Sequence, residues 1–213
     1  MKEKLKFIFT LIILLSTYIF ICAYSYVNAV SENLSNNVFR LHVLANSDSQ
    51  EDQNLKYKIR DSLIEYMNTL SANCSSKEEV IKIANAHIED FKQIAENTIK
   101  NQGYSYSAQV EIGNFEFPTK NYGDVSFPAG YYDALRVKIG KAKGQNWWCV
   151  MFPPLCFVDV TTGIVPEESK QELESNLNEE EYQIVSDNES PDIKFKFKLI
   201  EFFEQRGLIT AKK

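Results

Sequence analysis

Histidine is scarce in this chain, and so are the motifs of nucleophilic catalysis. Only His42 and His87 occur in 213 residues. His87 falls on the apolar stripe of an expected helix, which favours a structural role for it. The sequence contains no G-x-S-x-G, no H-E-x-x-H, no C-x-x-C and no glycine-rich phosphate loop. We therefore expect no catalytic residue, no cofactor and no bound metal ion.

Basic residues are fewer than acidic residues. The chain has 23 Lys and Arg against 29 Asp and Glu, for a net charge of −6. Three of the lysines, Lys2, Lys4 and Lys6, lie in the first six residues, so the body is still more acidic. Phosphate recognition needs a positive surface, which argues against a nucleic-acid partner. The excess of acidic residues also argues against electrostatic binding of the body to anionic lipid.

The first thirty residues carry a targeting signal. A short basic leader precedes Phe7–Ala23, a run of seventeen residues without charge. A run of this length suits the core of a signal peptide or a short membrane anchor. Val27 and Ala29 suit the −3 and −1 places of a cleavage site after Ala29. Residues 1–30 are thus expected to be either a cleaved signal peptide or a retained anchor, and both export the body.

Residues 38–165 show the periodicities of one α+β domain. The alternating pattern from Val38 predicts a strand, and Ser49 and Ser76 are placed to cap two amphipathic helices. The second helix is expected to run to Gly103, after which the period changes to two. No strand–helix–strand alternation repeats. We predict an antiparallel sheet with two amphipathic helices on one face, plus a C-terminal helical element.

Residues 166–213 differ in composition from the domain before them. Residues 166–183 contain seven Glu and one Lys, a pattern typical of an exposed helix or a mobile linker. Residues 193–208 alternate like a strand at first but also fit a helix, which we favour as an element docked on the body. This part of the chain is expected to be an acidic linker followed by an amphipathic segment.

Two of the four cysteines lie in the most unusual stretch, Gln145–Asp159, which also holds both tryptophans. Cys149 and Cys156 are too far apart for the close ligand pairs of a zinc site. In an exported chain a disulfide across a turn at Phe152-Pro153 is favoured, and two buried, reduced thiols are the alternative. Trp147 and Trp148 are neighbours, so in a strand they face opposite ways.

Carboxylates are plentiful, but none of them stands at a spacing that marks an acid–base pair. Asp48 and Asp52 follow a strand end and could gather a cation, but capping of the helix that follows them explains both and is favoured. Glu116, Asp124 and Asp133 lie near an expected hairpin. Because a catalytic pair can also assemble from distant segments, a hydrolase stays open as an alternative.

Three long motifs carry a family resemblance. They are R-L-x-V-L-A-N-S-D-S from Arg40, F-P-T-K-x-Y-G from Phe117 and G-x-N-W-W-C-V-x-F-P-P-L-C-F from Gly144. Over residues 38–159 the chain resembles the stage II sporulation protein R family of endospore-forming Firmicutes. The acidic C-terminal part lies outside this resemblance.

The resemblance implies an intercellular signal rather than an enzyme. In that family the forespore exports the protein into the intermembrane space of the sporulation septum. There it activates a membrane-embedded aspartic protease in the mother-cell membrane, which then processes pro-sigma-E. Aromatic residues near the motifs are the expected partner contacts: Tyr122, Phe127, Trp147 and Trp148. The competing interpretations are a secreted hydrolase or a wall-binding module at the septal peptidoglycan.

Overall fold

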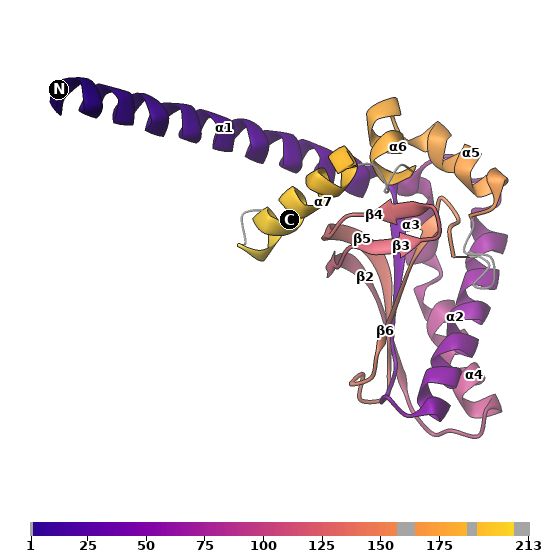
Figure 1. The fold of residues 1–213 in the computed structure, drawn as a ribbon. Helices are drawn as coiled ribbons and strands as arrows, with labels where there is room; N and C mark the ends of the chain where they lie inside the picture. The colour runs from indigo at the N-terminus through magenta and orange to yellow at the C-terminus, as the bar shows by residue number, and fades with distance from the viewer. Residues whose placement is uncertain (1, 157–164, 187–190, 207–213) are drawn as a thin grey trace.

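The computed structural model describes residues 2–156, 165–186 and 191–206, and the elements below are those of this part of the chain. Seven helices and six strands occur there (Figure 1). In chain order they are α1 (Lys2–Asn37), β1 (Phe39–Leu44), α2 (Gln50–Ser71), α3 (Lys77–Ala86), α4 (Ile88–Asn101), β2 (Ala108–Phe117), β3 (Lys120–Tyr122), β4 (Val125–Phe127), β5 (Gly130–Ile139), β6 (Asn146–Phe152), α5 (Glu167–Asn176), α6 (Glu179–Ser186) and α7 (Pro191–Gln205).

The main sheet has four strands in the order β2-β5-β1-β6, and β3 and β4 form a separate small hairpin. The expected α+β class is confirmed, but the sheet is mixed rather than antiparallel. Strands β2 and β5, and likewise β1 and β6, pair antiparallel, whereas β1 pairs parallel with β5 from Arg40↔Ala134 to Leu44↔Lys138. The chain reaches β5 only after three helices and three strands, and that long connection allows the parallel pairing.

Helices α2, α3 and α4 cover one face of the sheet, as expected (Figure 1). The hydroxyl of Ser49 accepts from the Asp52 N–H and that of Ser76 from the Glu79 N–H, so both expected caps are confirmed. The single helix expected from Ser76 to Gly103 is instead broken at His87, which has φ −111° and ψ 19°. The His87 ring also lies 3.0 Å from the Tyr66 hydroxyl, so a side-chain contact accompanies the break.

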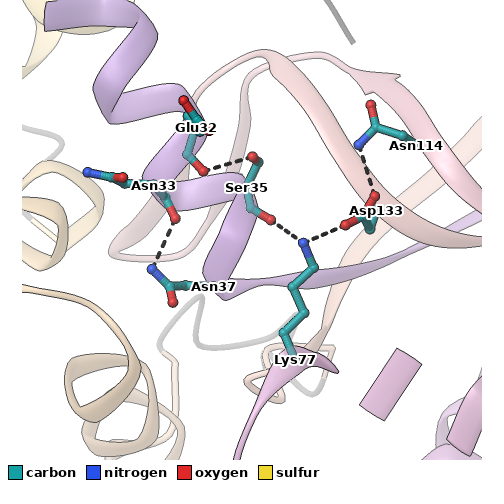
Figure 2. A network of polar contacts seen from close by, with 7 residues as sticks. All are labelled: Glu32, Asn33, Ser35, Asn37, Lys77, Asn114 and Asp133. Atoms are coloured by element: carbon teal, nitrogen blue, oxygen red, sulfur yellow. Dashed lines mark hydrogen bonds and ion pairs between the residues drawn. The ribbon is translucent and has the colours of Figure 1, made fainter. Parts of the chain in front are cut away.

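The last turns of α1 belong to the folded domain. Val27, Val30 and Leu34 are buried in its core. At the helix end, the Lys77 ammonium donates to the Ser35 carbonyl at 2.5 Å and pairs with Asp133 at 2.6 Å (Figure 2). A cation at a helix C-terminus is favourable because the last carbonyls there lack partners. This contact ties α1 to both α3 and β5.

The earlier part of α1 is different. Its apolar side chains from Leu5 to Ile21 are largely exposed. Within the described residues α1 is the one helix long and apolar enough to cross a membrane, which fits either a signal sequence or an anchor. In Figure 1 this part of α1 projects away from the domain.

The acidic segment forms helices rather than an extended linker. Leu173 of α5 and Ile184 and Val185 of α6 are buried, and α6 contacts β4. Lys170 pairs with Asp124 at 2.5 Å and so ties α5 to the β3–β4 turn. The C-terminal element is the helix α7, as we favoured, and it packs against α1 and β5.

Candidate functional site

A groove of about 440 Å³ runs along β6, the edge strand of the main sheet. Helix α2 and the β3–β4 hairpin also supply residues to its lining. The lining includes three cations and four aromatic side chains, and no described Asp or Glu: Lys56, Arg60 and Lys120, with Tyr57, Tyr122, Trp147 and Trp148. We call this surface the β6 groove. The chain as a whole has a net charge of −6, so this lining differs from it in carrying cations without carboxylates.

A hydrogen-bonded chain connects the core to the floor of the β6 groove. Arg40 Nη2 donates to the Tyr122 hydroxyl at 2.7 Å, and that hydroxyl donates to the Trp148 carbonyl at 3.1 Å. The first, second and third motifs of the sequence contribute one residue each. Burial raises the pKa of Tyr122, although Arg40 opposes this shift, so the phenol stays neutral and can donate.

His42 supports Trp148 from within the sheet. The two residues face each other in the β1–β6 register, and their rings stack at 3.7 Å between centroids. Burial lowers the pKa of His42 to about 4, and the positive charges of Arg136, Lys138 and Arg40 act in the same direction. The ring is therefore neutral at pH 7 and contacts Asn146 Oδ1 through Nε2 at 3.0 Å. A neutral, stacked imidazole holds the Trp148 indole at a fixed position.

The loop before β6 is fixed by the first motif. The carboxylate of Asp48 accepts from the Gln145 N–H at 2.7 Å, and the Asn46 side chain accepts from the Lys141 N–H at 2.9 Å. Gly144 passes so close to Ser47 that a Cβ there would lie 2.1 Å from the Ser47 carbonyl oxygen. Only glycine fits this approach. The third motif therefore begins with Gly because it packs on the first.

Two cations of the groove lie one turn apart on α2. Arg60 lies 4.2 Å from the centroid of the Trp147 ring and also pairs with Asp61 at 2.6 Å. Lys56 is buried and donates to the Gln145 carbonyl at 3.1 Å. Burial lowers the pKa of Lys56, and the neighbouring Arg60 adds to this effect. An anionic group would therefore gain more here than at a fully solvated lysine.

Two carbonyls of the edge strand β6 already have partners outside the sheet. The Trp148 carbonyl accepts from Tyr122, and the Val150 carbonyl accepts from the Leu155 N–H at 3.1 Å. An edge strand normally offers such groups to an incoming strand. Recognition in this groove would therefore depend mainly on its side chains.

Cys149 and Cys156 lie at disulfide distance, with 5.3 Å between their Cα atoms, as favoured from the sequence. Both line the β6 groove. A bond between them would close the turn after β6 next to Leu155, which also lines the groove. Within the described residues Cys22 and Cys74 are free.

The four residues expected to contact a partner are not equivalent. Trp147 and Trp148 are half-buried in the groove, and they face opposite sides of β6 as expected, one against Tyr57 of α2 and the other against His42. Tyr122 lines the groove but is largely buried, and Phe127 is fully buried beside it. Phe127 therefore supports the groove from behind.

Sequence reasoning missed the cations of the groove. Lys56 and Arg60 stand at i and i+4 on α2, a spacing that places two side chains on one helical face. Tyr57 lies next to them. The spacing is a usable signal, but it becomes informative only once α2 is known to border β6.

Four of the carboxylates considered for catalysis have structural partners of their own. Asp52 accepts hydrogen bonds from Asn46 and Ser47, Asp124 pairs with Lys170, and Asp133 pairs with Lys77. Asp48 holds the loop before β6. Within residues 2–156, 165–186 and 191–206, no three His, Cys, Asp or Glu side chains gather as metal ligands would.

Comparison with known proteins finds a family match over the part of the chain that contains the three motifs. The family model described as stage II sporulation protein R matches residues 35–162. Stage II sporulation protein R of Bacillus subtilis (strain 168) is 39% identical over 141 residues, which cover 66% of this chain and 63% of that relative. No solved structure matches. The chain belongs to the stage II sporulation protein R family.

Proposed function

We propose that this protein is an exported signal that activates a membrane-embedded aspartic protease in the mother-cell membrane, which then processes pro-sigma-E. The forespore would export it into the intermembrane space of the sporulation septum. Family membership supports a role in sporulation, and the apolar first part of α1 supports export.

The observation that carries the proposal is the convergence of the three family motifs on the β6 groove. Arg40, Tyr122 and Trp148 come from different motifs and form one hydrogen-bonded chain beneath it. A signal changes its receptor only by binding the active state more tightly than the inactive state. The rigid groove is the surface we assign to that binding.

The lining indicates the chemistry of the partner. Trp147 and Trp148 are the side-chain type most often found at binding hot spots, and Arg60 and Lys120 add positive charge at the rim. We propose that the groove receives an acidic segment of the protease outside the membrane. Opposite charge would speed the encounter, and the tryptophans would supply most of the binding energy.

The direct test is co-expression of this protein with the protease and pro-sigma-E in a host that does not sporulate. We expect processing that depends on this protein. Processing at the same level without it would show that the protease does not need the signal. No processing at all, with this protein, the protease and pro-sigma-E all present, would contradict the proposed activation.

The groove itself is tested by charge reversal in the same assay. Lys120→Glu and Arg60→Glu place an acidic side chain where an acidic partner is proposed, and we expect the doubly substituted chain to lose processing. Lys100→Glu is the matched control, because Lys100 is exposed on α4 and does not line the groove. Equal processing by the two variants would remove the groove from the proposal while leaving the signalling role intact.

A further inference from the structure

Helix α7 contacts α1 at the C-terminal end of the uncharged run Phe7–Ala23. The ring of Phe203 lies 5.3 Å from that of Phe20 and 5.6 Å from that of Tyr24, between centroids. Phe20 belongs to the uncharged run Phe7–Ala23. In Figure 1 α7 lies beside α1 where that helix leaves the domain. A bilayer around the run would therefore reach the end of α7.

The depth of this contact can be placed from helix geometry. Phe20 is three residues before the end of the run, which corresponds to roughly 4–5 Å along the helix axis. Helices that lie in a membrane interface bury their apolar face by about 5–10 Å. Phe203 is thus held at the depth at which an interfacial helix places its apolar side chains.

The exposed side chains at this end of α7 suit an interface. Phe202 is 40% exposed, although it is a large apolar side chain. Its ring packs edge-on against Phe203 at 5.5 Å, and the Arg206 guanidinium lies 3.6 Å above it. Lys198 is exposed one turn before Phe202. Long cationic side chains next to an aromatic ring can reach headgroups while the ring enters the acyl boundary.

We propose that α7 is a second membrane contact, an interfacial helix seated on the lipid surface where α1 leaves the bilayer. It would use Phe202 as its apolar insertion and Arg206 with Lys198 as its headgroup contacts. The acidic body of the chain does not oppose this, because the contact depends first on apolar burial. The proposal requires α1 to stay attached, and it does not depend on the protease or on the β6 groove.

Two membrane contacts would have a consequence for signalling. A single spanning helix leaves a domain free to rotate and tilt on its surface. A second contact through α7, together with the Lys77 bonds that hold the end of α1, would fix which face of the domain points away from the membrane. Orientation of this kind lowers the entropic cost of binding a receptor across a narrow space.

The test places a fluorophore at position 202 in the full chain in lipid nanodiscs. Cys22→Ser and Cys74→Ser remove the two free thiols, and Phe202→Cys then carries an environment-sensitive label. Lys100→Cys on α4 is the matched control site. Nanodiscs of phosphatidylcholine, with and without phosphatidylglycerol, contain lipid spin-labelled near the headgroup as a quencher. Circular dichroism confirms that both labelled chains are folded.

We expect several-fold stronger quenching at position 202 than at position 100, with a blue-shifted emission at position 202 only. Quenching at position 202 in either lipid composition supports the membrane contact, and a gain with phosphatidylglycerol assigns part of it to Arg206 and Lys198. Equal quenching at the two positions in both compositions would overturn the proposal. Processing in the co-expression assay is read separately, so failure here does not count against the signalling role.

Discussion

Arg40 donates a hydrogen bond from Nη2 to the Tyr122 hydroxyl, 2.7 Å away, in the interior of the domain. The arginine is fully buried, and its Nε and Nη1 atoms have no hydrogen-bond partner among the described residues. Its Cζ lies 4.1 Å from the centroid of the Phe117 ring and 4.6 Å from that of Tyr132. Aromatic faces and one hydroxyl therefore stabilise a charge that is usually paired with a carboxylate.

Tyr122→Phe should destabilise the protein by about 1–3 kcal/mol, because it removes the one hydrogen-bond partner that the structure gives to the Arg40 guanidinium. Urea unfolding of the detergent-solubilised chain measures the change. Tyr57→Phe is the control. Because Tyr57 is partly exposed, removing its hydroxyl should change the free energy of unfolding by no more than about 0.5 kcal/mol. Equal effects of the two changes would mean that the buried bond contributes nothing.

Arg40→Met combined with Tyr122→Phe should destabilise by less than the sum of the two single changes. The methionine removes the buried charge, so the phenylalanine no longer leaves that charge without a partner. Unfolding of the four chains of this double-mutant cycle gives the coupling directly. Simple additivity would show that the two side chains act independently despite their contact.

His42 should make the domain less stable as the pH falls from about 6.5 towards 4. Burial lowers its folded pKa to about 4 from the ordinary 6.5, so the unfolded chain binds more protons in this window. The stabilisation is fully present above pH 6.5 and decreases by about 3 kcal/mol by pH 4. Unfolding at four pH values, compared with His42→Phe, isolates the effect. A variant with the same pH slope as the unaltered protein would exclude His42 as its source.

The disulfide should stabilise the oxidised protein by about 2–3 kcal/mol, the amount that the chain-entropy model gives for so short a loop. Reductant should lower the Tm of the unaltered chain and leave the Tm of a Cys149→Ala, Cys156→Ala chain unchanged. The Cys74→Ala chain, which keeps the pair, should respond to reductant like the unaltered protein. Intact mass with and without reductant gives a second measure, and no difference of two hydrogens would mean no bond.

Local patterns predicted the elements of this fold better than their pairing. The caps at Ser49 and Ser76 are confirmed because a cap depends on residues three positions apart. The parallel pairing of Leu41 with Leu135 joins residues 94 positions apart in the chain. A strand that alternates on one face has the same pattern in either orientation, so the sequence did not distinguish a mixed sheet from an antiparallel one.

For the β6 groove, too, the sequence predicted local features but not the long-range contacts. Trp147 and Trp148 face opposite ways because successive strand residues must do so. The burial of Tyr122 was not predictable, since its neighbours Asn121, Gly123 and Asp124 are typical of an exposed turn. In the interior the Tyr122 hydroxyl accepts a hydrogen bond from Arg40, 82 residues earlier in the chain, and local sequence does not reveal such a partner.

Lys77→Met should loosen the end of α1 while leaving the rest of the domain folded. The change keeps most of the side-chain volume but removes the donor to the Ser35 carbonyl and the partner of Asp133. We expect a loss of about 1–3 kcal/mol. Hydrogen exchange should speed up most at the last turn of α1, and Lys100→Met on the exposed side of α4 should change neither property. Unchanged exchange around Ser35 would show that the burial of Val30 and Leu34 holds α1 in place without Lys77.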